Sequence, residues 1–135
     1  MLKLIVGVKG TGKTKILIDM VNEAIHSSHG NVVCIEKGIK LRYDIKYQAR
    51  LINTEDYMIS DAQALYGFVA GIFASNHDVT DLFIDSSLKI CNNDIKAIEF
   101  LSEEFGKLSE ATKINIVMTI SYPIAEIPES IKKYL

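Results

Sequence analysis

The feature that most constrains this chain is the octet Gly7–Thr14, which reads G-V-K-G-T-G-K-T. It fits the pattern G-x-x-x-x-G-K-[ST] at every fixed position. The glycines allow a sharp turn that brings backbone N–H groups against phosphate oxygens, because no Cβ stands in the way. The lysine can reach the terminal phosphates, and the last hydroxyl can bind Mg²⁺. The octet therefore predicts a phosphate-binding loop that opens a helix, where unpaired N–H groups favour an anion.

The segments on either side of the octet have the periodicity that such a loop requires. Residues 2–6 form a short apolar run with a β-branched end, as a buried strand would. Beyond the octet, Leu17, Val21 and Ile25 recur at helical spacing, and Gly30 marks a C-terminal stop. Strand, loop and helix thus come in the required order, which argues against a chance match. The predicted contacts to nucleotide phosphates are Gly7, Val8, Lys9, Gly10, Thr11, Gly12, Lys13, Thr14 and Lys15.

Length and composition predict one folded domain over residues 1–135, since 48% of the residues are hydrophobic. The net charge of −2 argues against a general nucleic-acid binder, so nucleic acid is not expected as a partner. No apolar stretch approaches the roughly twenty residues that span a bilayer, and no signal-peptide pattern precedes the first strand. Cys34 and Cys91 lack CxxC spacing, which indicates reduced thiols. We therefore expect a cytoplasmic protein that does not bind membranes.

Strand-like and helix-like segments alternate along the rest of the chain. The further segments predicted as strands are residues 31–36, 81–85 and 114–120. One helix is predicted to begin at Ser60, because Gln63 completes a capping box. Asn92 or Asn93 is predicted to cap the other helix. This alternation predicts an α/β fold, a three-layer sandwich with a mainly parallel sheet and right-handed crossovers.

Residues 41–48 follow a different pattern, in which apolar and polar side chains alternate. A period of two indicates a strand that is wetted on one face, so we predict an antiparallel edge strand or a hairpin there. Residues 50–53 would be its mate or a separate short strand. Tyrosines beside basic residues in segment 41–50 also suit a protein partner or self-association. They equally suit a packed edge strand.

Asp85 ends the apolar run at residues 82–84. Its carboxylate would lie at the carboxyl end of the sheet beside Thr14, where the two could hold Mg²⁺, the carboxylate through a water. A surface aspartate that merely ends a strand is the plainer alternative.

The octet and Leu82–Asp85 together resemble the P-loop NTPases of the RecA/AAA-like branch. The size and layout resemble short bacterial P-loop proteins catalogued as ATP-binding or as twitching-motility ATPase-like. The resemblance implies the P-loop NTPase fold, ATP as ligand or substrate, and Mg²⁺. The longer twitching-motility ATPases carry an N-terminal domain and acidic and histidine boxes that this sequence lacks, so their function does not transfer.

The resemblance also implies a strand order and a sensor. In the RecA-like branch a strand inserts between the P-loop strand and the aspartate strand, and residues 114–120 would be that strand. This implies the core order 1-4-3-2, with the four core strands numbered along the chain. A polar residue near the end of the inserted strand often senses the γ-phosphate, which makes Thr119 or Ser121 the candidate. A solvated strand end is the alternative, with equal weight.

Hydrolysis needs a group that orients or deprotonates the attacking water. Many related proteins place a glutamate directly after the strand-end aspartate, where this chain has Ser86. The RecA-like subgroup places it instead at the end of the strand after the P-loop helix, and Glu36 occupies that place. The resemblance thus implies Glu36 and Lys13 as catalytic residues. An exposed strand-end glutamate is the alternative for Glu36.

These sites favour an Mg·ATP-binding protein with weak or partner-stimulated ATPase activity. The alternative is a nucleotide-dependent switch or assembly module without significant hydrolysis. A small-molecule kinase ranks lower, because no arginine-bearing lid follows the third strand or helix. The guanine-reading pattern N-K-x-D is absent, and adenine is favoured only by default.

Overall fold

The computed structural model describes residues 1–135, which form an α/β fold around one five-stranded sheet. The sheet order is β1-β5-β4-β2-β3, and every neighbouring pair is parallel. The strands are β1 (Leu2–Gly7), β2 (Asn31–Glu36), β3 (Arg50–Asn53), β4 (Val79–Ile84) and β5 (Asn115–Ser121). The helices are α1 (Lys13–Ser27), α2 (Ala62–Ser75), α3 (Ser87–Ile90) and α4 (Ile95–Thr112). Short 3₁₀ helices are η1 (Thr54–Tyr57), η2 (Ile124–Glu126) and η3 (Glu129–Tyr134).

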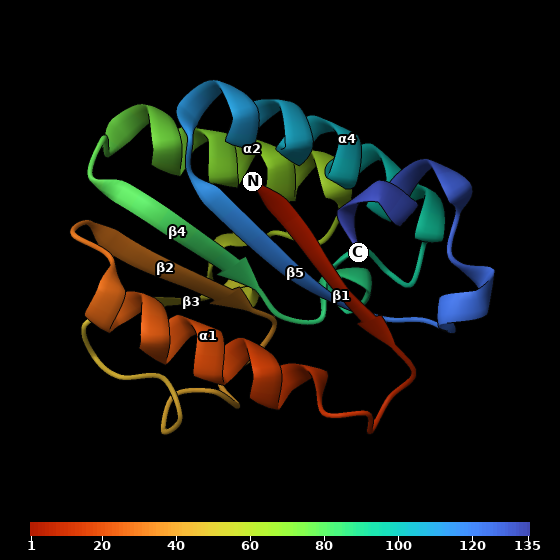
Figure 1. Ribbon diagram of the computed structural model, residues 1–135, viewed down its shortest axis with the longest axis horizontal. Helices are drawn as coiled ribbons and strands as arrows, with labels where there is room; N and C mark the ends of the chain where they lie inside the picture. The colour runs from red at the N-terminus through yellow and green to blue at the C-terminus, as the bar shows by residue number, and fades with distance from the viewer.

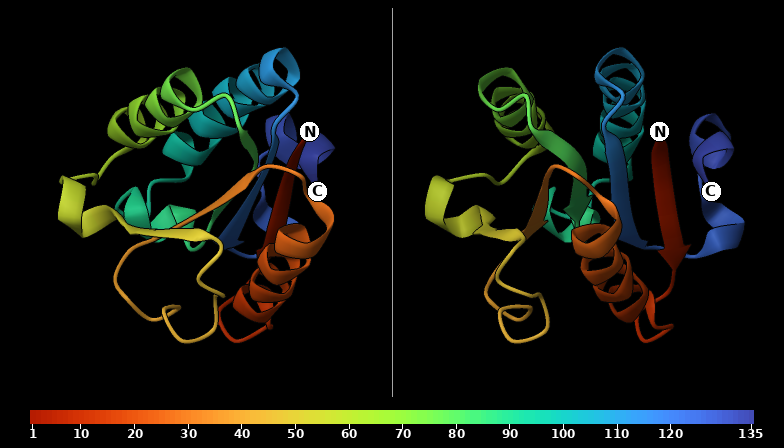
Figure 2. Two further views of the ribbon diagram at one scale, coloured as in Figure 1. Left: turned by 90° about the vertical axis from the view of Figure 1, so that its left-hand side faces the viewer. Right: turned by 60° about the vertical axis from the view of Figure 1, so that its left-hand side comes forward.

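The helices cover both faces of the sheet, as the alternation of segments predicts. Figure 1 shows α1 on one face and α2 with α4 on the other, and the turned views of Figure 2 separate the same layers. The connection after β1 therefore leaves toward one face, while the connection after β4 leaves toward the opposite face. Loops that diverge in this way at the carboxyl ends of parallel strands leave a crevice where ligands bind.

Two apolar clusters hold the layers together. The larger lies between the sheet and the α2–α4 layer, and Ile98, Leu101 and Phe105 of α4 are fully buried in it. The smaller lies under α1, where Leu17 and Val21 are fully buried, which confirms their predicted helical spacing. Burial of each such side chain contributes about 1.5–3 kcal/mol, so each helix is fixed on its face of the sheet. None of the helices combines the length and the apolar character needed to cross a bilayer.

Both cysteines are free and buried in this core. Burial is the main cause that raises the pKa of Cys34, and it raises the pKa of Cys91 to about 11. The neutral thiol is therefore the stable form of both side chains, which pack as small hydrophobic groups.

The predicted antiparallel edge strand or hairpin at residues 41–48 is wrong. These residues form turns, in which the N–H of Ile45 donates to the carbonyl of Leu41 at 3.0 Å. Leu41, Ile45 and Ala49 are buried against the α1 cluster, whereas Tyr43 and Tyr47 are 85% and 91% exposed. The buried side chains of this segment thus recur every four residues, not every two. The edge strand is β3 alone, and it pairs parallel to β2.

Both predicted helix caps are displaced by one or two residues. Asp61, not Ser60, caps α2, because its carboxylate accepts the N–H of Ala64 at 2.8 Å. Asp94 caps α4 in the same way, by accepting the N–H of Lys96 at 3.0 Å. Asn92 and Asn93 instead take left-handed backbone angles, φ 56° and 60°, in the turn that joins α3 to α4. Asparagine tolerates this conformation better than most residues, which explains the pair.

Candidate phosphate-binding site

The octet forms the tight connection between β1 and α1. Gly10 and Gly12 have φ of 86° and 84°, a region that residues with a Cβ seldom adopt. Gly12 is the N-cap of α1, which begins at Lys13. A Cβ at Gly7 would lie 2.7 Å from Thr11 Oγ1, so a larger residue there would force the Thr11 side chain to shift. Strand, loop and helix thus follow one another as the sequence predicts.

Lys13 lies across this loop and is only 8% exposed. Its Nζ donates to the carbonyl oxygen of Val8 at 2.9 Å, and Thr11 Oγ1 donates to the same oxygen at 2.7 Å. Burial lowers the pKa of Lys13, and the negative charge of Asp85 acts in the opposite direction. The ammonium is therefore held against the loop backbone, beside the amide groups that would meet a phosphate.

Asp85 directly follows β4 and is 7% exposed. Thr14 Oγ1 lies 3.2 Å from each of its two carboxylate oxygens, and Thr119 Oγ1 donates to Oδ1 at 2.7 Å. The two residues predicted to bind metal are thus brought into contact from the ends of different segments. A hydroxyl and a carboxylate are hard oxygen donors, and Mg²⁺ commonly takes one or two such protein ligands with phosphate and water completing its shell. The donor set fits Mg²⁺.

Thr119, one of the two sensor candidates, is 1% exposed and lies two residues before the end of β5. Its hydroxyl donates to Asp85 and accepts the N–H of Ser86 at 2.7 Å. It therefore fixes the direction of the Asp85 carboxylate and the position of Ser86, the next residue of the loop after β4. Ser121, the other candidate, is exposed and lines the same pocket.

Replacing Thr119 with valine should lower the free energy of unfolding by about 1–3 kcal/mol, because the N–H of Ser86 would be left without its acceptor. Urea unfolding followed by circular dichroism would measure this loss. The matched control is Thr112→Val at the exposed end of α4, where the hydroxyl donates to the carbonyl of Leu108 and accepts the N–H of Ile114 only at 3.4 Å. A Thr119 variant as stable as the control would show that the hydroxyl does not hold Asp85 and Ser86 together.

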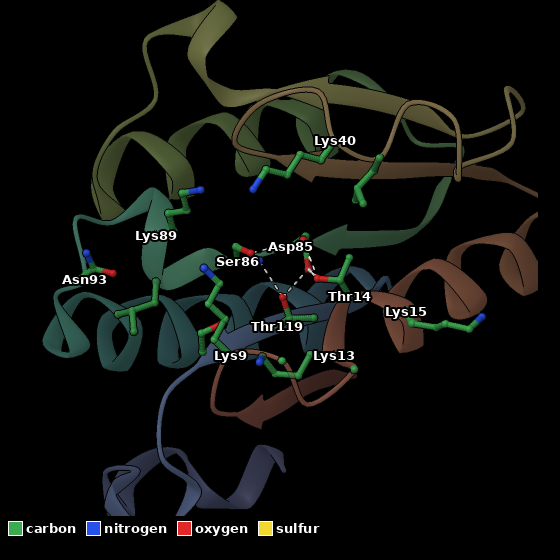
Figure 3. A pocket seen from close by; sticks show the side chains of 15 residues that line it. Lys9, Lys13, Thr14, Lys15, Lys40, Asp85, Ser86, Lys89, Asn93 and Thr119 are labelled. Atoms are coloured by element: carbon green, nitrogen blue, oxygen red, sulfur yellow. Dashed lines mark hydrogen bonds between the residues drawn. The ribbon is translucent and has the colours of Figure 1, made fainter.

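These residues line a cavity of about 530 Å³, within the range of pockets that hold small ligands. Figure 3 shows Thr14, Ser86 and Thr119 gathered around Asp85, whereas the side chain of Lys15 points away from it. The lysines among the 15 lining residues are Lys9, Lys13, Lys15, Lys40 and Lys89, whereas Asp85 is the one acidic residue. The pocket is thus cationic, although the chain carries a net charge of −2. Its chemistry suits an anion accompanied by a divalent cation.

Sequence reasoning missed Lys40 and Lys89, which come from the segment after β2 and from α3. Both follow strands that end at the site, as do the residues that were predicted. The sequence signal that could have identified them is a charged residue within a few positions of the carboxyl end of a parallel strand.

Glu36 does not line the pocket, and it is not the exposed strand-end residue of the alternative interpretation. It is 3% exposed, and its Oε1 and Oε2 accept the backbone N–H groups of Lys40 and Leu41 at 3.2 and 3.0 Å. Burial raises the pKa of Glu36, and these two hydrogen bonds oppose the rise. Both carboxylate oxygens are therefore directed at the segment that follows β2.

A scan of the sequence against protein-family models finds no match, and a search of the curated proteins finds none either. The function is therefore inferred from the chemistry of the site. Loop amides and an ammonium form one half of that chemistry, which attracts phosphate. A hydroxyl and a carboxylate form the other half, which attracts a divalent cation.

Proposed function

We propose that this protein binds Mg·ATP at the loop between β1 and α1 and is a weak or partner-stimulated ATPase. The observation that carries the proposal is the contact between Thr14 and Asp85, which are 71 positions apart in the sequence. A glycine-rich turn alone would not need an aspartate from another strand beside its last hydroxyl. A nucleotide site does, because Mg²⁺ must reach both the protein and the phosphates.

The sheet supports assignment to the RecA/AAA-like P-loop NTPases. β5 lies between β1, which leads into the phosphate loop, and β4, which leads into Asp85. This is the insertion expected for that branch. The pocket also lies where connections to opposite faces diverge, the usual ligand position in parallel α/β sheets.

Within this proposal each residue has a separate role. The loop amides and Lys13 bind phosphate oxygens, Thr14 and Asp85 hold Mg²⁺, and Thr119 orients the aspartate. Mg²⁺, when bound, neutralises charge on the β- and γ-phosphate oxygens. These groups bind and polarise the triphosphate, but they do not by themselves activate a water molecule.

The isolated chain should hydrolyse ATP slowly. Asp85 is the one carboxylate that lines the pocket, and it already accepts hydrogen bonds from the hydroxyl groups of Thr14, Ser86 and Thr119. The carboxylate of Glu36 is directed at backbone N–H groups instead. No further carboxylate in the pocket is free to orient water, so fast turnover would require a group from a partner.

The same arrangement supports a second candidate, a nucleotide-dependent switch without significant hydrolysis. Lys40 lines the pocket, and Tyr43 and Tyr47 are exposed on the same short segment. The guanidinium of Arg42 lies 4.8 Å from the centroid of the Tyr43 ring, which leaves an aromatic and cationic surface suited to a protein partner. The segment therefore joins the pocket to a candidate docking surface within residues 41–50.

Calorimetry and thermal unfolding with Mg·ATP test the proposal. A ligand at 100 times its Kd stabilises the folded chain by about 2.7 kcal/mol, so the melting temperature should rise measurably. EDTA should weaken the effect, and single-turnover assays should show slow release of phosphate. No heat of binding and no thermal shift at millimolar Mg·ATP would contradict the proposal. Binding without any phosphate release would favour the switch.

A further inference from the structure

Lys40 extends into the pocket from the side opposite the phosphate loop. Figure 3 shows its side chain and that of Lys13 on opposite sides of Asp85. Lys40 is exposed and takes part in none of the four ion pairs in the structure. Its ammonium is therefore a positive charge of the pocket that forms no direct ion pair with a protein carboxylate, although it is close enough to Glu36 to oppose the rise in the pKa of that carboxyl group.

The backbone that carries Lys40 is fixed by three side-chain hydrogen bonds. Asn53 Oδ1 accepts the N–H of Gly38 at 2.8 Å, and Glu36 accepts the N–H groups of Lys40 and Leu41. Leu41 is itself only 3% exposed in the α1 cluster. The segment is thus held at β2, at β3 and in the core.

A buried carboxylate, that of Glu36, fixes the position of the Lys40 backbone. Removing a carboxylate from water is costly unless its oxygens receive hydrogen bonds. Glu36 meets that condition with two consecutive amides, the N–H groups of Lys40 and Leu41, which lie on either side of the Lys40 Cα. A hydrophobic residue could fill the space, but it could not fix both N–H groups.

We propose that Lys40 contacts the γ-phosphate of the bound nucleotide and makes the pocket prefer triphosphates over diphosphates, with Glu36 as the residue that positions it. This inference rests on the proposed function. Lys13 and the loop amides hold the phosphates from one side, and Lys40 approaches from the other, beyond the metal-binding pair. A diphosphate would leave the ammonium of Lys40 without a partner. A charge-assisted contact of this kind corresponds to about a 10- to 100-fold difference in affinity.

The test compares the Kd values for Mg·ATP and Mg·ADP in the full chain by calorimetry. Lys40→Ala should weaken Mg·ATP binding by about 10- to 100-fold and change Mg·ADP binding by less than about 3-fold. Lys40→Arg should restore most of the preference, since it keeps the charge. Lys37→Ala is the matched control, because Lys37 belongs to the same segment but does not line the pocket.

Glu36 is tested by the same ratio of Kd values. Glu36→Gln keeps one acceptor oxygen but turns an amide group toward a backbone N–H, so it should reduce the preference for Mg·ATP. Glu36→Ala should reduce it further, to the level of Lys40→Ala. A loss of preference with Mg·ADP binding intact indicates positioning of Lys40, whereas damage to the fold would weaken both ligands.

The outcomes separate this inference from the function on which it rests. An unchanged ratio in Lys40→Ala, or an equal loss for both nucleotides, would overturn the role of Lys40. A changed ratio in Lys40→Ala together with an unchanged ratio in both Glu36 variants would overturn the role of Glu36. Absence of binding by the unmodified chain would overturn the proposed function as well.

Discussion

Replacing Lys13 with alanine should weaken Mg·ATP binding by at least about 30-fold. The ammonium lies against the loop that would hold the phosphates, at 8% exposure, so its contact with the ligand would be largely shielded from water. Truncating one partner of such a buried charge pair costs about 2–5 kcal/mol, and every 1.4 kcal/mol is a tenfold change in Kd. Calorimetry with Mg·ATP would measure the loss directly.

Folding should survive this substitution, which keeps the test specific to binding. Burial lowers the pKa of Lys13, so the folded chain holds this proton less tightly than the unfolded chain does. The cost of burying the ammonium therefore offsets part of its hydrogen bond to Val8, which is worth about 1.5–3 kcal/mol, and its removal should change the free energy of unfolding by less than that. Lys107→Ala, on the exposed face of α4, is the control. Undiminished ATP affinity in Lys13→Ala would show that the octet Gly7–Thr14 does not bind the nucleotide.

Replacing Asp85 with asparagine should abolish most of the increase in ATP affinity that Mg²⁺ produces. The substitution keeps the shape of the side chain and an oxygen that can accept a hydroxyl group, but it removes the charge beside Thr14. Hydrogen bonds to charged groups are worth about 1.5–3 kcal/mol, so the Mg²⁺-dependent part of the affinity should fall by about 10- to 100-fold. Titration of Mg²⁺ at a fixed ATP concentration would measure it.

Asp81→Asn provides the matched control for this experiment. Asp81 lies on the same strand, β4, but it contacts Thr80 and Asn115 and does not line the pocket. It should leave the Mg²⁺ dependence unchanged. The same Mg²⁺ response in Asp85→Asn and in the unmodified chain would mean that the metal is held elsewhere.

The site was predictable where a local motif or the rule for parallel strands determines it. The octet encodes its own turn through Gly10 and Gly12, whose backbone angles few other residues adopt. The approach of Asp85 to Thr14 follows because carboxyl ends of parallel strands meet at one edge of the sheet. Neither inference requires knowledge of how distant side chains pack.

The segment after β2 was not predictable on those grounds. Its apolar residues fit a period of two, but Leu41, Ile45 and Ala49 also fit a period of four, and packing under α1 selects the second. Sequence could place Glu36 at the end of a strand, but it could not give the direction of its carboxylate. That direction depends on where the amides of Lys40 and Leu41 lie, which is a consequence of the same packing.

The excess of lysine around the pocket has a consequence for how a ligand arrives. The chain carries more acidic than basic residues, 17 against 15, yet lysines outnumber acidic residues around the mouth of this pocket. An electrostatic field of this kind attracts small anions to the mouth of the pocket and raises their association rate. The rest of the surface has no excess of basic residues that could bind a long polyanion such as a nucleic acid. Because the Debye length is about 8 Å at physiological ionic strength, this attraction acts only near the entrance. Capture would therefore slow as salt rises, even where the contacts inside are unchanged.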